Sequence, residues 1–194
     1  MVKIINKKEL DNLIRNIWKK SSSKRKRILS AIAISLLALI VTALGMLVPT
    51  SQQEAELINN NLNQTVSSLT QGGGIVQFIF GNNFMICLLM FIPIIGPLLG
   101  FYALFNTGTV INAIAIAEGF PSAVVFIALF LTPVAWIEYA AYSTAISESI
   151  WLFRRFLKKQ TQKELRNTSI FISICGVLLL IGAIVETIII FVGQ

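Results

Sequence analysis

The sequence predicts an all-α fold, a polytopic α-helical membrane protein with about five transmembrane helices. Apolar residues make up 55% of the chain and charged residues 13%, and the apolar residues gather in runs of about 20, the length with which a helix crosses a bilayer. No Lys or Arg occurs between Arg27 and Arg154, so two basic clusters bracket a long, almost uncharged stretch. These observations exclude a soluble domain, and the absence of alternating apolar and polar residues argues against a β-barrel.

Residues 1–27 are expected to form a cytoplasmic, basic, amphipathic N-terminal helix. Asn6 and Glu9 have the spacing of a capping box, and apolar residues then recur at helical spacing opposite lysines and arginines. Such a helix suits the membrane surface, and a helix that binds a partner protein would have the same pattern. The two basic clusters supply the candidate membrane-surface anchors: Trp18, Lys19, Lys20, Lys24, Arg25, Lys26, Arg27, Trp151, Arg154 and Arg155.

The basic clusters also predict the topology, because Lys and Arg beside a span remain on the cytoplasmic side. Residues 28–194 are expected to form a single transmembrane domain of the cell membrane, with the N-terminus in the cytoplasm and the C-terminus outside. The expected spans are 28–48, 75–95, 97–117, 121–146 and 170–192, with an outer loop at 49–74 and an inner basic loop at 151–167.

The outer loop has no basic residue and carries Glu54 and Glu56. Asn63, followed by Gln64 and Thr65, forms a possible N-glycosylation site. An apolar stripe at helical spacing predicts a helix in this loop, lying on the membrane or facing a partner: Ile58, Leu62, Val66 and Leu69.

Polar and helix-breaking residues interrupt the central spans. Asn82-Asn83 interrupts the second span, Gly96-Pro97 separates it from the third, and Asn106-Thr107-Gly108 interrupts the third. These residues are compatible with full crossings and equally with half-helices or a re-entrant pair, which requires protein or a water-filled cavity around the freed backbone groups. The charge pattern fits both arrangements.

Glu138 is the leading candidate for function, because a carboxylate inside a membrane needs a partner or a proton. Counted from Pro121 along a continuous helix, it lies about 25 Å into the fourth span. Pro133 frees a backbone carbonyl for another partner. Two roles are open for Glu138: a structural clamp, or a site that handles an ion or a substrate. The other carboxylates of this region lie near span ends, where each is expected to reach water: Glu118, Glu148 and Glu186.

The residue types give no support to catalytic or cofactor chemistry. The chain has no His, which removes the commonest general base and transition-metal ligand. Cys87 and Cys175 lie in apolar runs without metal-ligand spacing, and no nucleophile with a base, or phosphate-binding loop, is visible. The net charge of +7 is explained by basic residues beside the spans, so no nucleic-acid partner is expected. We expect no enzyme, no metal and no other cofactor.

Three landmarks between residues 75 and 156 resemble the stage II sporulation protein M family, integral membrane proteins of unassigned biochemical activity. They are the apolar run that ends in Asn82-Asn83, the break Phe105-Asn106-Thr107-Gly108, and Pro133 followed by Glu138. Many members read Pro-His-Gly at the third landmark, where this chain has Pro133-Val134-Ala135, so a role that needs a His–Glu pair is not carried over.

The resemblance implies a scaffold, because the member that acts in sporulation localises cell-wall hydrolases at the membrane. We therefore expect a non-enzymatic membrane scaffold or a subunit of a membrane protein complex, with the lipid bilayer and other membrane proteins or further copies of the chain as partners. A transporter or channel component that uses Glu138 is the alternative. The expected polar core comprises Asn82, Asn83, Asn106, Gly108, Pro133 and Glu138.

Overall fold

The computed structural model describes residues 23–159 and 161–193, and these fold into seven α-helices with no strand among them. The helices are α2 (Ser23–Gly45), α3 (Gln52–Gln71), α4 (Ile75–Met90), α5 (Ile95–Glu118), α6 (Ser122–Leu131), α7 (Pro133–Leu157) and α8 (Thr161–Gly193). The predicted N-terminal amphipathic helix, with Trp18, Lys19 and Lys20, lies outside the described residues.

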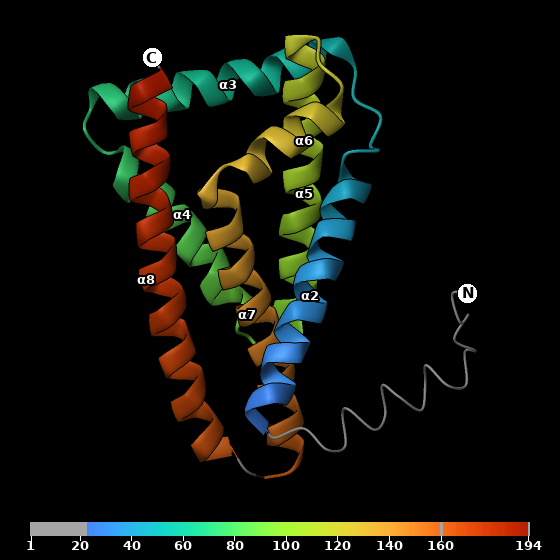
Figure 1. Ribbon diagram of the computed structural model, residues 1–194, viewed down its shortest axis with the longest axis vertical. Helices are drawn as coiled ribbons and strands as arrows, with labels where there is room; N and C mark the ends of the chain where they lie inside the picture. Colours follow the sequence, from blue (N-terminus) through green and yellow to red (C-terminus); the bar gives the residue numbers. More distant parts are fainter. Residues whose placement is uncertain (1–22, 160, 194) are drawn as a thin grey trace, which may run out of the picture.

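Three of these helices are long and apolar enough to cross a membrane: α2, α5 and α8. Together, α6 and α7 pass the same test as a bent pair, and α4 is apolar but only 16 residues long. The chain is therefore an α-helical, membrane-embedded protein, as predicted. Its long helices run between two ends of the molecule, which we call the α3 end and the hairpin end, where α7 turns into α8 (Figure 1).

Helix α3 lies across one end of the bundle, roughly perpendicular to α5 and α8 (Figure 1). It confirms the helix predicted between residues 49 and 74. The Ser51 hydroxyl accepts the Glu54 N–H, and the Glu54 carboxylate accepts the Ser51 N–H, which forms a capping box at the first turn. Within α3, the side chain of Ala55 is fully buried, whereas Asn63 is exposed.

Helices α2 and α5 cross at two glycines, Gly45 and Gly108. A Cβ atom on Gly108 would collide with the carbonyl oxygen of Thr42 and lie 3.0 Å from the Cα of Gly45. Close approach of this kind is what small residues allow between membrane helices. The prediction that Asn106-Thr107-Gly108 interrupts the third span is wrong: α5 is continuous, and Gly108 serves contact between helices.

The turn between α4 and α5 falls at the predicted boundary before Gly96-Pro97. Ile94 has φ of 70° and ψ of −56°, and the Ile95 N–H donates to the Pro93 carbonyl at 2.8 Å, which together describe a classic γ-turn. The Ser149 hydroxyl on α7 donates to the Ile92 carbonyl at 2.7 Å. A neighbouring helix thus satisfies a carbonyl that the turn leaves free.

The broken helix of this fold lies in the fourth predicted span rather than in the second or third. Helix α4 is continuous through Asn82-Asn83, whereas residues 121–146 break at Thr132, where α6 and α7 meet at 88°. The expectation of a continuous helix from Pro121 to Glu138 is therefore wrong. The physical reason is Pro133, which forms the first residue of α7 and excludes the preceding residue from helical geometry.

Side chains next to this break satisfy its free carbonyl groups. The Thr132 hydroxyl donates to the Leu129 carbonyl at 2.7 Å, and the Trp136 indole N–H donates to the Phe130 carbonyl at 2.8 Å. Backbone that leaves helical geometry inside a membrane requires such partners. Because of the break, α7 begins part of the way along the bundle (Figure 1) and carries Glu138 in its second turn.

Candidate functional site: the buried polar face of helix α7

Helix α7 buries an unusual number of polar side chains for a helix of a membrane protein. Tyr139, Ser143 and Ser147 follow one another at intervals of four residues, and all three are buried. Residues spaced in this way lie on one face of a helix. Alanines between them, Ala141 and Ala145, are fully buried as well and let the neighbouring helices approach this face.

Glu138 lies at one end of this region and is paired with α4. Its Oε1 accepts a hydrogen bond from the Asn83 side-chain amide at 2.5 Å. Asn82 is exposed and lies 3.3 Å from the Asn83 side chain. The carboxylate of Glu186 on α8 acts electrostatically on Glu138. A neutral amide therefore holds this carboxylate between two helices.

Two hydroxyl pairs join the polar face of α7 to α2. The Thr42 hydroxyl donates to the Ala38 carbonyl, so Tyr139, 2.6 Å away, donates to Thr42. The Ser147 and Ser30 hydroxyls lie 2.7 Å apart, and since Ser30 donates to the Arg27 carbonyl, Ser147 donates to Ser30. Between these pairs, the Ser143 hydroxyl is buried and has no hydrogen-bond partner among the described residues.

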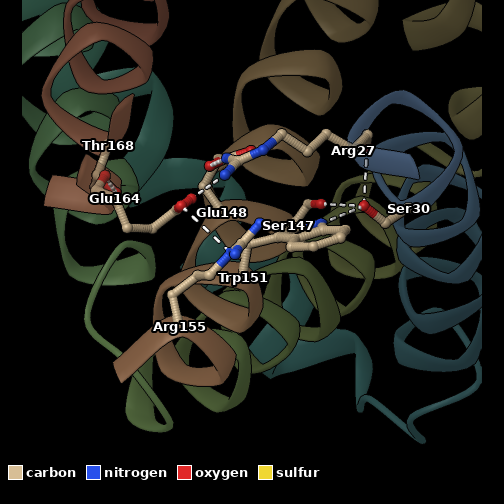
Figure 2. A network of polar contacts seen from close by, with 8 residues as sticks. All are labelled: Arg27, Ser30, Ser147, Glu148, Trp151, Arg155, Glu164 and Thr168. Atoms are coloured by element: carbon tan, nitrogen blue, oxygen red, sulfur yellow. Dashed lines mark hydrogen bonds and ion pairs between the residues drawn. The ribbon is translucent and has the colours of Figure 1, made fainter. Parts of the chain in front are cut away.

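Arg27 connects three helices at the hairpin end. One terminal nitrogen of its guanidinium donates to Glu148 on α7, and the other donates to Glu164 on α8 (Figure 2). The side chains of Glu148 and Glu164 are only 3% and 5% exposed, and that of Arg27 is 14% exposed. The Nε of Arg155 lies 3.7 Å from Glu164, so two cations offset two carboxylates in this cluster. We call these four residues the arginine network.

Aromatic rings and hydroxyls surround the arginine network. The Arg27 guanidinium carbon lies 5.3 Å from the centre of the Trp151 ring and 5.9 Å from that of Phe171, within the range of cation–π attraction. The Trp151 indole N–H donates to the Ser30 hydroxyl at 3.0 Å, and that hydroxyl donates to the Arg27 carbonyl (Figure 2). The ring faces thus cover part of the guanidinium that water would otherwise bind.

The residues of the polar core predicted from the sequence lie in different parts of the structure. Asn83 and Glu138 meet, whereas Gly108 contacts α2, and Pro133 begins α7 at the break. Asn106 lies on α5, where its backbone carbonyl accepts the Thr109 hydroxyl. These residues therefore do not form one cluster.

The residues predicted to be surface anchors also lie in different environments. Arg154 is exposed as expected, and so is Arg25, whereas Arg27 and Trp151 contact each other inside the bundle. The side chain of Lys24 is outside the described residues. Arg27 is thus buried in a network rather than displayed at the surface, because two buried carboxylates attract it.

Sequence reasoning missed the partners of Arg27. Glu148 was expected to reach water, but it is 2% exposed. Glu164 was not singled out at all. The available signal was that Glu148 precedes the second basic cluster and Glu164 lies within it, although nothing in the sequence says which cation each would meet.

At the α3 end, Asn112 performs a similar connecting role with neutral groups. Its amide donates to the Val48 carbonyl at 3.0 Å and its side-chain oxygen accepts the Ser122 hydroxyl at 2.6 Å. In the predicted glycosylation site near this end, the Thr65 hydroxyl donates to the Asn61 carbonyl within α3.

Within the described residues, no group of three or more Cys, Asp or Glu side chains is placed to hold a metal ion. Cys87 and Cys175 are buried, unbridged thiols. The polar face of α7 consists of carboxylates and hydroxyls, most of which bind polar side chains on neighbouring helices. No protein-family model matches this chain, and no curated protein or solved structure matches it either.

Proposed function

We propose that this chain is a non-enzymatic integral membrane scaffold or a subunit of a membrane protein complex, related to the stage II sporulation protein M family. The observation that supports this role best is the internal pairing of its buried polar groups. Glu138 is bound to Asn83, and Glu148 and Glu164 are bound to Arg27. Because breaking a buried pair leaves an uncompensated charge, carboxylates that are already paired stay in place and offer little to a substrate.

The proposed topology has five crossings, with the N-terminus in the cytoplasm and the C-terminus outside. Helices α2, α5 and α8 supply three crossings, and the bent pair of α6 and α7 supplies one. Helix α4, with 16 residues, is the fifth; it would span about 24 Å and so requires a locally thin bilayer or polar ends. In this topology α3 lies on the outer surface and the hairpin end lies in the cytoplasm.

The test of the scaffold role is purification of the full chain from its native membrane in mild detergent, with quantitative mass spectrometry of the proteins that accompany it. We expect partners in stoichiometric amounts, and the same partners with the Glu138→Gln variant if that residue is a structural clamp. A chain that purifies alone, from several detergents, would contradict the proposal.

Transport is the second candidate, and a specific observation favours it. Glu138 and Glu186 are two carboxyl groups within the apolar region, and the charge of Glu186 acts on Glu138. A second carboxylate nearby favours a proton or a cation at Glu138. Flux of protons or monovalent cations in proteoliposomes tests this role. Flux that disappears in Glu138→Gln would support it, whereas proteoliposomes without flux would leave the scaffold as the better account.

A further inference from the structure

Among the described residues of the hairpin end, cations are exposed and acids are buried. Arg154, Lys158 and Lys159 on or just after α7, and Arg166 on α8, all have exposed side chains. The carboxylates of this end, Glu148 and Glu164, are buried and bound to Arg27. Arg155 also lies against Glu164, so both carboxylates face cations inside the bundle. Within the described part of the chain, the acids of this end are thus buried, and the four exposed cations face outward, where an external anion can reach them.

Large apolar side chains stand among these cations. Phe156, Leu157 and Leu165 are 62%, 66% and 50% exposed. A surface that alternates exposed cations with exposed apolar residues matches the boundary between lipid headgroups and acyl chains, where the apolar groups enter the membrane and the cations meet phosphates. A soluble acidic partner would match the cations but would leave the apolar side chains without a suitable environment.

We propose that the α7–α8 hairpin is a binding surface for anionic phospholipids, formed by Arg154, Lys158, Lys159 and Arg166 with the adjoining apolar side chains. The arginine network is what makes the surface selective, because it removes two negative charges that would otherwise weaken the attraction to phosphate. The proposal requires only that the chain lies in a membrane. It holds whether the protein is a scaffold or a transporter, so its failure and theirs are separate results.

The experiment uses the full chain in nanodiscs that contain equal amounts of phosphatidylglycerol and phosphatidylcholine. Native mass spectrometry of the released protein then counts the lipids of each kind that remain bound. We expect wild-type protein to retain severalfold more phosphatidylglycerol than phosphatidylcholine. Since exposed charges are screened by salt, we expect this preference to fall when the ionic strength rises from low values to about 0.5 M.

Two variants make the test specific. Replacement of all four cations by Gln should remove the preference, with a loss of roughly fivefold in relative affinity for each charge removed. The matched control exchanges the two kinds of cation, with Arg154→Lys, Arg166→Lys, Lys158→Arg and Lys159→Arg, and should keep the preference. Thermal unfolding in phosphatidylcholine alone establishes that both variants are folded.

Two results would overturn the proposal. The first is a preference that is the same in the wild type and in the Gln variant. The second is a Gln variant that keeps its lipids but loses a protein partner during extraction from native membranes, which would assign this surface to an acidic protein. If the Gln variant fails to fold, the salt dependence of the wild type decides: a preference that salt leaves unchanged would also refute the proposal.

Discussion

Glu138 and Glu148 lie ten residues apart on the same helix, and the protein stabilises them in different ways. Glu138 accepts a hydrogen bond from the neutral side chain of Asn83, whereas Glu148 is bound to the charged side chain of Arg27. The first contact joins two helices, and the second belongs to a network that joins three. The difference shows that a buried carboxylate in this bundle is a connection between helices, and that its strength depends on how many charges the connection contains.

Among the changes that test this comparison, loss of Arg27 is expected to lower the stability of the protein most. Arg27→Gln leaves Glu148 buried without a cation and leaves Glu164 with Arg155 alone, so we expect the free energy of unfolding to fall by about 3–5 kcal/mol. The control is Arg154→Gln, which removes an exposed charge of the same hairpin end and should change stability by less than about 0.5 kcal/mol. Thermal unfolding of the purified protein in detergent measures both; equal losses would mean that the network contributes nothing.

A helix contact without charged groups provides a loss of stability with which the effects of the two carboxylates can be compared. Gly108→Ala adds a methyl group where the Thr42 carbonyl and Gly45 already touch α5, so we expect α2 and α5 to separate and stability to fall by about 3 kcal/mol. Gly81→Ala is the matched control within α4, because nothing lies within 4 Å of its added Cβ. That change should be neutral or stabilising, by up to about 1 kcal/mol. A Gly108 variant as stable as the Gly81 variant would contradict the crossing.

The pair formed by Asn83 and Glu138 is expected to have a smaller effect than the arginine network. Asn83→Ala removes the only hydrogen-bond donor that the described residues offer to Glu138 and should cost about 2 kcal/mol. Glu138→Gln keeps an oxygen that accepts the same bond and lowers the cost of burial, so its loss should be below about 1 kcal/mol. Asn82→Ala, at an exposed neighbour, is the control. Should Glu138→Gln prove the more damaging change, the clamp role would be refuted.

The smallest effect concerns Glu54, a carboxylate at the surface. Hydrogen bonds from the Ser51 backbone N–H and hydroxyl hold the pKa of Glu54 below its ordinary value. A lowered pKa in the folded state contributes stability that is present at neutral pH and is lost as the pH falls through that lowered pKa. Hydrogen exchange of the first amides of α3 should therefore accelerate in acid. Glu54→Gln should exchange faster at neutral pH and respond less to acid; an unchanged acid response would assign the effect to other groups.

The sequence by itself determined the class of the protein and, to within two residues, where α4, α5 and α6 begin. Runs of apolar residues predict membrane helices because burying backbone in lipid demands local hydrogen bonds, which only a helix supplies within one segment. Gly96-Pro97 marked the start of α5, and the apolar stripe of residues 58–69 marked α3. Glu138 was also identified from the sequence, because a carboxylate in an apolar run needs a partner wherever that partner lies.

Only the tertiary structure decided which groups meet. Asn83 reaches Glu138 across 55 residues of chain, and Arg27 reaches Glu148 across 121. No local sequence pattern predicts contacts between residues so far apart in the chain, because pairing depends on how the helices pack and rotate against one another. The break at Thr132 and the close crossing at Gly108 follow the same rule. A proline in the sequence permits a bend and a glycine permits a close approach; only the folded structure shows that the chain turns by 88° before Pro133 and that Gly108 meets α2.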